Sequence, residues 1–194
     1  MDDVVVLGTG AAGLVAALAA HDAGAVVGLY EKGDVVGGTT ALSGGIVWIP
    51  YNPHMAEDGF ADSRDDALAY LSSLSLGIIE PAMAAALVDT GPAVVSWLES
   101  ATPLRLQIVA GYPDYHPERP GGKPGGGRSL DPGRFAFEEL GPWADRVARP
   151  PSLPRLDLLE TPLGGGSGRI EPAELDRRVA RDVRGRGQAL VGTP

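Results

Sequence analysis

Six residues near the start of the chain, Gly8-Thr9-Gly10-Ala11-Ala12-Gly13, match the pattern G-x-G-x-x-G. An apolar run precedes them, an Ala- and Leu-rich run follows them, and Glu31 stands 23 residues after Gly8. In that context the pattern is typical of a dinucleotide-binding turn, because such glycines permit a tight turn and let backbone amides approach a pyrophosphate. The predicted cofactor contacts are Gly8, Gly10, Ala11, Ala12 and Gly13. We expect Glu31 to accept hydrogen bonds from the hydroxyls of an adenosine ribose.

A second glycine-rich segment, residues 37–45 (GGTTALSGG), comes shortly after Glu31-Lys32. Paired glycines bring bare backbone close to a ligand, and Thr and Ser add short hydroxyl groups. NAD has no need of such a segment directly after the acidic residue. FAD does, because its ribityl chain and isoalloxazine extend beyond the pyrophosphate. The sequence therefore predicts FAD, with further contacts from Lys32, Gly38, Thr39, Thr40, Ser43, Gly44 and Gly45.

The residues EKGDVVGGTTALSGGIVWIP resemble the FAD-binding segment of the flavoprotein family that includes fumarate reductases and 3-ketosteroid Δ1-dehydrogenases. Thr39 favours the ketosteroid branch, since fumarate reductases more often carry Asn after the paired glycines. Residues 112–118 (YPDYHPE) and 127–132 (GRSLDP) resemble the dehydrogenase segment that brings a tyrosine to the substrate side of the flavin. Residues 187–192 (GQALVG) are similar to the start of a helix that leads back into the FAD domain.

This resemblance implies an FAD-dependent oxidoreductase that removes hydrogen from a carbon–carbon bond next to a ketone. The implied partner is a small apolar ketone or steroid-like substrate. Tyr115 is implied as a catalytic helper beside the flavin, with Tyr112 as the competing candidate. A fumarate-reductase-like flavoprotein and a truncated, non-catalytic FAD-binding fragment stay open as alternatives. Because the family's chains are longer, we expect an incomplete domain whose C-terminal half is missing.

The elements that must position these residues can be predicted from the same pattern. A strand over 3–7, a helix over 11–23 and a strand over 25–30 form a βαβ unit. We therefore predict an α/β fold, a Rossmann-like FAD-binding domain with a parallel sheet flanked by helices. The whole of 1–194 is interpreted as a partial domain. Residues 1–50 form its dinucleotide-binding core and flavin-contacting segment, and 51–194 form a helical and Gly/Pro-rich loop region.

Later in the chain, Ser63 indicates the start of a helix, and Asp62, Asp65 and Asp66 are interpreted as helix-start acids and not as metal ligands. Glu80-Pro81 opens another helix through Leu87, and Gly91-Pro92 is expected to interrupt it before a restart through Leu98. Residues 111–170 are crowded with Gly and Pro and are predicted to be loops. A last helix is expected over 172–184, with Leu175, Val179 and Val183 on one stripe.

Composition excludes several function classes. The chain has no cysteine and only three scattered histidines, which rules out disulfides and thiolate ligands and leaves no predicted metal site. Residues 1–100 carry 2 basic and 13 acidic residues, which argues against a nucleic-acid partner. No uncharged apolar run reaches the ~18 residues of a transmembrane span. The acidic start does not match a secretory signal, so we expect a cytoplasmic protein.

Overall fold

The computed structural model describes residues 1–152 and 155–193. Their contacts divide the chain into two compact units that do not follow chain order. Unit 1 comprises residues 1–45, 132–157 and 170–194, and unit 2 comprises residues 46–131 and 158–169. The division expected at residue 50, between a dinucleotide-binding core with its flavin-contacting segment and a helical and Gly/Pro-rich loop region, stays a prediction.

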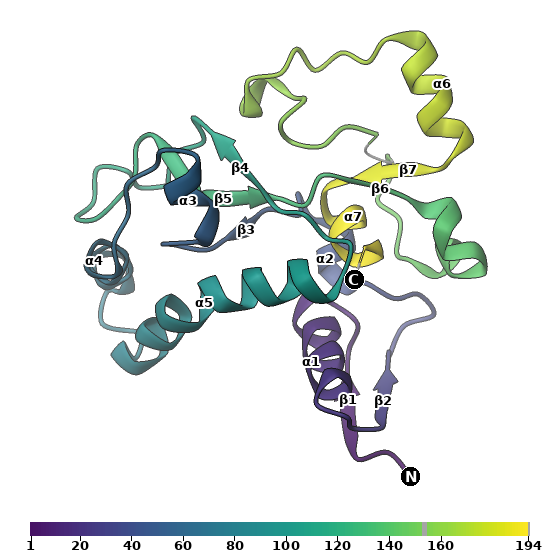
Figure 1. The fold of residues 1–194 in the computed structure, drawn as a ribbon, viewed down its shortest axis with the longest axis horizontal. Helices are drawn as coiled ribbons and strands as arrows, with labels where there is room; N and C mark the ends of the chain where they lie inside the picture. The colour runs from purple at the N-terminus through teal and green to yellow at the C-terminus, as the bar shows by residue number, and fades with distance from the viewer. Residues whose placement is uncertain (153–154, 194) are drawn as a thin grey trace. The chain divides into compact units, whose positions relative to one another are not determined.

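Unit 1 begins with the expected βαβ unit (Figure 1). Its elements are β1 (Val4–Leu7), α1 (Ala11–Asp22) and β2 (Val27–Tyr30). The two strands pair in parallel, with Val4 opposite Val27 and Leu7 opposite Tyr30. Gly24 ends the helix in the left-handed backbone region at φ +86°, as expected of a residue just after a helix. Alternate β1 residues Val5 and Leu7 are exposed, so α1 covers only one face of this pair.

The remaining elements of unit 1 come from the second half of the chain. They are α2 (Gly38–Leu42), β6 (Arg134–Ala136), η1 (Phe137–Arg146), α6 (Pro172–Ala180), β7 (Val183–Gly185) and α7 (Arg186–Gly192). Strands β6 and β7 pair antiparallel. The apolar core joins α2 to these later segments through Ala41, Phe137, Val147 and Val191. The segment that carries the second glycine motif is thus held by residues about a hundred or more positions away.

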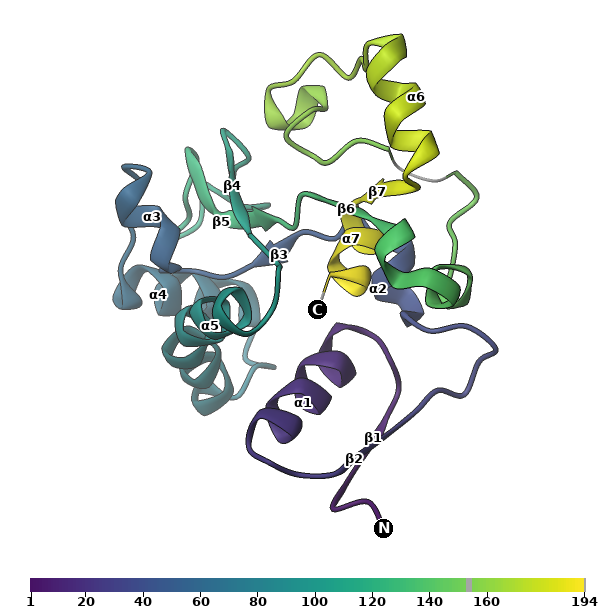
Figure 2. The same cartoon turned by 45° about the vertical axis from the view of Figure 1, so that its right-hand side comes forward.

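Unit 2 combines helices with a three-stranded antiparallel sheet (Figures 1 and 2). Its elements are β3 (Val47–Trp48), α3 (Pro53–Glu57), α4 (Arg64–Ser75), α5 (Pro81–Ala101), β4 (Gln107–Ala110), β5 (Gly126–Asp131) and η2 (Pro162–Gly164). The strand order is β3-β5-β4, so β5 is the central strand. Helices α4 and α5 pack against one another. Ser63 caps α4 as predicted, accepting a hydrogen bond from the Asp66 N–H at 3.1 Å.

Three sequence predictions about these elements are wrong. The break expected at Gly91-Pro92 is absent, and α5 runs unbroken through Pro92. Val88, Gly91, Val95 and Leu98 are buried along one side of α5, and this packing outweighs the cost of a proline inside a helix, about 3 kcal/mol. The last helix ends at Ala180, because Asp182 turns to φ +47° and the residues after it pair with β6. Asp tolerates that left-handed conformation better than most residues do.

The third correction concerns residues 111–170, which contain strands β5 and β6 and the 3-10 helices η1 and η2 as well as loops. All six residues of β5 are buried, although two of them are glycines. A Cβ on Gly127 would lie 2.7 Å from the Met55 side chain, so this strand position has no room for a larger residue. Glycine weakens strand propensity, which hides such a strand from sequence reasoning.

Helix α5 is also the one helix of the described residues that is long and apolar enough to cross a membrane by length and composition. Asp89 and Glu99 interrupt its apolar sequence. Its Val88, Val95 and Leu98 side chains belong to the buried core of unit 2. A core helix meets the same two criteria, so length and composition alone do not indicate a membrane span here.

Candidate functional site

The first glycine motif forms a close turn between β1 and α1. Gly8 adopts φ +102°, and its N–H donates a hydrogen bond to the Tyr30 carbonyl at 2.7 Å. A Cβ on Gly13 would lie 2.0 Å from the Gly8 carbonyl oxygen, so only glycine lets α1 approach the strand this closely. The N–H groups of Ala12 and Gly13 lie in the first helical turn, which offers them no intrahelical acceptor. Such donors are suited to a phosphate.

Glu31 is bound to this turn through Thr9. The Thr9 hydroxyl donates to Glu31 Oε2 at 2.5 Å, and the Thr9 N–H donates to the same oxygen at 3.0 Å. The Gly33 N–H donates to Oε1 at 3.0 Å. The Thr9 hydroxyl, followed by the Gly33 and Thr9 amides, lowers the pKa of Glu31 from 4.5 to about 2. The carboxylate is therefore ionised at neutral pH and oriented at the end of β2.

The second glycine motif is joined to the first by hydroxyl groups. Thr9 Oγ1 accepts a hydrogen bond from the Gly37 N–H at 2.9 Å. Thr40 Oγ1 accepts one from the Ala11 N–H at 3.1 Å, at the start of α1. The two threonines thus hold residues 8–13 and 37–40 together. Thr9 is 3 % exposed and was missed by sequence reasoning, because the motif treats its position as free.

Helices α2 and α7 pack so closely that their backbones are in contact. A Cβ on Gly187 would lie 1.9 Å from the Thr40 carbonyl oxygen, and one on Gly45 would lie 2.3 Å from the Arg186 carbonyl carbon. The Ser43 hydroxyl donates to the Thr40 carbonyl at 2.8 Å and accepts from the Gly45 N–H at 3.0 Å. Gly45, which sequence reasoning assigned to cofactor contact, therefore also has a packing role.

The predicted cofactor contacts in unit 1 differ in how open they are. Gly8, Gly10, Ala11, Gly13, Glu31 and Thr40 are half-buried at the turn, and Gly45 is buried against α7. The exposed members, which present backbone and hydroxyl groups on the surface of unit 1, are Ala12, Lys32, Gly38, Thr39, Ser43 and Gly44. Arg186 Nε, beside this segment, is buried without a hydrogen-bond partner among the described residues. Open helix-start amides, exposed glycine backbone and an unpartnered guanidinium nitrogen together fit an extended anionic dinucleotide.

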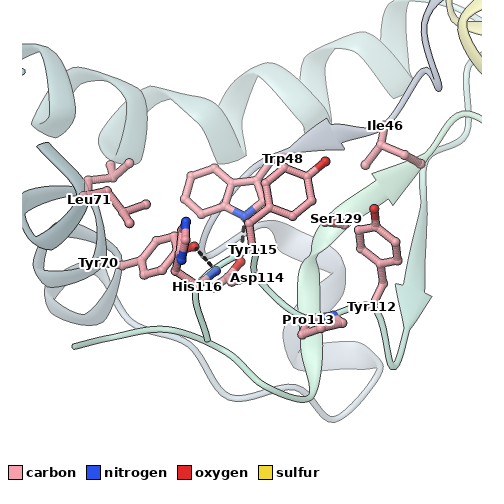
Figure 3. Close-up of a pocket in the computed structure, with 11 residues that line it drawn as sticks. Ile46, Trp48, Tyr70, Leu71, Tyr112, Pro113, Asp114, Tyr115, His116 and Ser129 are labelled. Carbon is pink, nitrogen blue, oxygen red and sulfur yellow. Dashed lines mark hydrogen bonds between the residues drawn. The ribbon is translucent and has the colours of Figure 1, made fainter. Parts of the chain in front are cut away.

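Unit 2 contains a separate pocket of about 280 Å³ (Figure 3). Its wall is largely aromatic and apolar, and its lining residues are Ile46, Trp48, Tyr70, Leu71, Leu74, Tyr112, Pro113, Asp114, Tyr115, His116 and Ser129. Tyr115, the predicted catalytic helper, lines this pocket and is 84 % exposed. Tyr112, its competitor, lines the same pocket, so the structure brings both candidates together.

Beneath the pocket lies a buried ion cluster made of Asp62, Asp114 and Arg128. Arg128 donates to both carboxylate oxygens of Asp62, at 2.7 and 2.8 Å, and to Asp114 Oδ2 at 2.9 Å. All three side chains are at most 1 % exposed. Burial acts to raise the pKa of Asp62, but the hydrogen bonds and the charge of Arg128, together with the Tyr51 and Ser63 amides, outweigh burial and hold the pKa below the ordinary value.

The buried ion cluster corrects one sequence interpretation. Asp62 was grouped with Asp65 and Asp66 as acids of a helix start, yet its side chain is fully buried and bound to Arg128. Sequence reasoning also missed Trp48 and Tyr70, whose rings lie 5.6 and 5.4 Å from the Arg128 guanidinium carbon. No local signal could reveal this grouping, because its members come from four separate segments.

Two phenols of the pocket, those of Tyr70 and Tyr112, have raised pKa values. Burial is the main cause that raises the pKa of Tyr112, and the neighbouring Tyr115 phenol raises it further. Burial likewise raises the pKa of Tyr70, whose hydroxyl accepts a hydrogen bond from the His116 N–H at 3.2 Å. Tyr70 and Tyr112 can therefore donate or accept hydrogen bonds near neutral pH, but they are poor bases.

Comparison with known proteins gives one family match. The model of the FAD binding domain family matches residues 3–187. The chain is 44 % identical over 156 residues to the 3-oxosteroid 1-dehydrogenase of Mycobacterium tuberculosis, a match that covers 80 % of this chain and 27 % of that enzyme. It is 37 % identical over 190 residues to the 4-oxocyclohexanecarboxylate 2-dehydrogenase of Sinomonas cyclohexanicum, covering 97 % of this chain and 33 % of the relative.

A solved structure extends the likeness to three dimensions. The 3-ketosteroid Δ1-dehydrogenase of Sterolibacterium denitrificans, solved with 1,4-androstadiene-3,17-dione, matches with a TM-score of 0.84 at 31 % identity. The match covers 99 % of this chain and 37 % of that enzyme. The chain therefore spans about a third or less of the length of these relatives.

Proposed function

The chain belongs to the FAD binding domain family, and from that premise we propose that its protein is an FAD-dependent dehydrogenase that desaturates a carbon–carbon bond next to a ring ketone. The observation that carries the proposal is the aromatic pocket of unit 2, which places Tyr112 and Tyr115 at an apolar wall. Both relatives described above are named for dehydrogenation of an oxo compound, which supports the same reaction class.

The cofactor site of this proposal lies in unit 1. The amides of Ala12 and Gly13 would hold the pyrophosphate, and Glu31 would hold the adenosine ribose through its ionised carboxylate. The segment from Gly38 to Gly45 would hold the ribityl and ring portions. When bound, FAD supplies the two-electron oxidation by accepting a hydride from the substrate.

Tyr115 would act on the substrate side. Desaturation removes a hydride, with its electron pair, from one carbon and a proton from its neighbour. The electron pair left by the departing proton forms the new double bond. The role that the family resemblance gives Tyr115 is to hydrogen-bond a second phenol, which takes the proton. The raised pKa of the adjacent Tyr112 fits a neutral hydrogen-bonding group better than an ionised base.

A steroid-like substrate is favoured over a carboxylate-bearing one. The described pocket lining contains no lysine or arginine, and the nearby Arg128 already donates to Asp62 and Asp114. A substrate carboxylate would therefore find no strong cationic partner in this part of the pocket. We propose a ketosteroid as the substrate class.

The test is turnover of 4-androstene-3,17-dione by the complete protein with an artificial electron acceptor. Mass spectrometry should show a product that has lost two hydrogens. Tyr115→Phe should lower turnover about ten- to a thousandfold with unchanged flavin content, on the scale of proton-transfer effects. Loss of turnover in Tyr112→Phe alone would transfer the role to Tyr112. A flavin-loaded protein that leaves the steroid unchanged would overturn the proposed function.

A further inference from the structure

The loop that carries the two pocket tyrosines, residues 112–116, is attached to the interior of unit 2 by the Asp114 side chain and by the His116 N–H, which donates to the Tyr70 hydroxyl. Asp114 is 3 % exposed, whereas its neighbour Tyr115 is 84 % exposed. The loop therefore points one side chain into the protein and the next one outward. Figure 3 shows Asp114 directed at the Trp48 indole, behind the phenols that line the pocket.

Asp114 makes contacts in three directions. Its Oδ1 accepts a hydrogen bond from Trp48 Nε1–H at 2.7 Å, on strand β3. Its Oδ2 accepts from Arg128 at 2.9 Å, on β5, and from the Lys123 N–H at 2.9 Å. The Asp114 N–H in turn donates to the Lys123 carbonyl at 3.1 Å. One carboxylate thus connects the tyrosine loop to two strands and to the far side of its own loop.

The cation that neutralises Asp114 is itself fixed. Arg128 is also bound by both oxygens of Asp62, and its guanidinium lies over the rings of Trp48 and Tyr70. A buried carboxylate with a cation and two further donors is satisfied, and a satisfied buried network is rigid. Asp62 accepts hydrogen bonds from the Tyr51 and Ser63 amides and pairs with Lys123 Nζ at 3.4 Å, but it makes no hydrogen bond with the described residues 112–116. The two carboxylates therefore share a cation but differ in what they hold.

We infer that Asp114 is a positioning residue, which holds Tyr112 and Tyr115 at the pocket wall through Trp48 and Arg128. The inference rests on the proposed function for its catalytic consequence, while the contacts that it names can be tested without substrate. Binding of an apolar ligand depends mainly on the pocket wall, whereas proton transfer depends on the place of a phenol. A displaced loop should therefore lower kcat more than it raises KM, since an error of about 1 Å in position can cost ~10²-fold in rate.

The experiment compares Asp114→Asn with Asp62→Asn in the complete, flavin-loaded protein. Each variant removes one of the two charges that face Arg128, but only the first loosens the tyrosine loop. We expect Asp114→Asn to lower kcat about ten- to a hundredfold with KM within about threefold. Asp62→Asn should lose thermal stability to a similar degree and keep kcat within about twofold, because Asp62 makes no hydrogen bond with the tyrosine loop. Equal kcat in the two variants would overturn the inference.

A second variant, Asp114→Glu, keeps the inference testable if Asp114→Asn does not fold. It keeps the charge beside Arg128 and displaces the loop by one methylene, so kcat should fall while stability stays near that of the wild type. Full kcat in a folded Asp114→Glu would contradict the positioning role.

Hydrogen exchange provides the readout that needs no substrate. The Trp48 indole N–H and the amides of 114–116 should exchange faster in Asp114→Asn than in Asp62→Asn. Equal exchange rates would overturn the inference even if the proposed function holds. Faster exchange in Asp114→Asn than in Asp62→Asn, combined with a wild type that does not oxidise ketosteroids, would support the positioning role of Asp114 and refute the proposed function alone.

Discussion

The cofactor region of unit 1 and the pocket of unit 2 are built from different parts of the chain's chemistry. In unit 1 the decisive groups are backbone amides and missing side chains, as at Gly13, whose Cβ would lie 2.0 Å from the Gly8 oxygen. In unit 2 they are charged and aromatic side chains gathered around Arg128. A site made of backbone amides and glycines can be recognised in a short stretch of sequence. A site made of side chains from distant segments is assembled only when the chain folds.

The largest expected effect comes from removing the cation of the buried ion cluster. Arg128→Met would leave Asp62 and Asp114 buried without their partner, which typically costs about 3–5 kcal/mol of unfolding free energy. Urea denaturation measures this loss. The matched control is Arg64→Met, which breaks the exposed Arg64–Asp89 pair and should change the free energy of unfolding far less, because exposed ion pairs contribute little. Similar losses of unfolding free energy in both variants would show that burial of the ion cluster does not increase its contribution to stability.

The next effect tests the close packing of unit 1. Gly13→Ala forces a methyl group against the Gly8 carbonyl, and such overpacking costs about 1–3 kcal/mol. The helix start should move away from the strand, and the purified protein should lose most of its flavin absorbance. Gly125→Ala, in open space with ordinary backbone angles, is the control and should retain flavin. Retained flavin in Gly13→Ala would place the pyrophosphate elsewhere.

A smaller effect is expected at Glu31. Glu31→Gln keeps the size of the side chain and removes the charge that would bind the ribose. A hydrogen bond to a charged acceptor is stronger than one to a neutral acceptor, so FAD affinity should fall about tenfold or more. Isothermal titration with FAD measures it. Unchanged affinity, or tighter binding of NAD than of FAD, would contradict the assignment.

The smallest effect concerns the pKa of Glu31 itself. Because its pKa in the folded protein, about 2, lies below the ordinary 4.5, its stabilising contribution is complete above pH 4.5 and is lost as the pH falls through about 2. Thr9→Val removes the main hydrogen-bond donor and should raise the pKa towards 4.5. Carboxyl NMR titration of the flavin-free protein detects the shift. The control, Thr39→Val at an exposed threonine of α2, should leave the pKa of Glu31 unchanged. An unchanged Glu31 pKa in Thr9→Val would show that the Thr9 hydroxyl does not lower it.

The same contrast explains which features could be predicted from sequence. The βαβ unit, the FAD cofactor and the Ser63 cap follow from patterns within one continuous stretch of sequence, over residues 3–30, 8–45 and 63–66 respectively. The continuous α5 could not be predicted at Pro92, because long-range packing of Val88 and Val95 overrides a local helix breaker. The role of Thr9 was hidden for a related reason, since its partners Glu31 and Gly37 lie more than twenty residues away.

The pocket of unit 2 shows most clearly which features could not be predicted from the sequence. Tyr115 could be proposed from a family resemblance, but the residues that hold its loop could not. Asp62 has the local signature of a helix-start acid and is instead bound to Arg128, 66 residues later. Contacts at such separations depend on the strand order β3-β5-β4, which no short motif encodes.

We propose that the protein uses FAD to oxidise a ketosteroid. The most direct measurement is anaerobic mixing of the complete, flavin-loaded protein with 4-androstene-3,17-dione, without any electron acceptor. We expect the visible flavin absorbance to bleach as two electrons pass from the steroid to FAD. The absorbance should return when an electron acceptor is added. Flavin that remains fully oxidised in the presence of saturating steroid would contradict the claim.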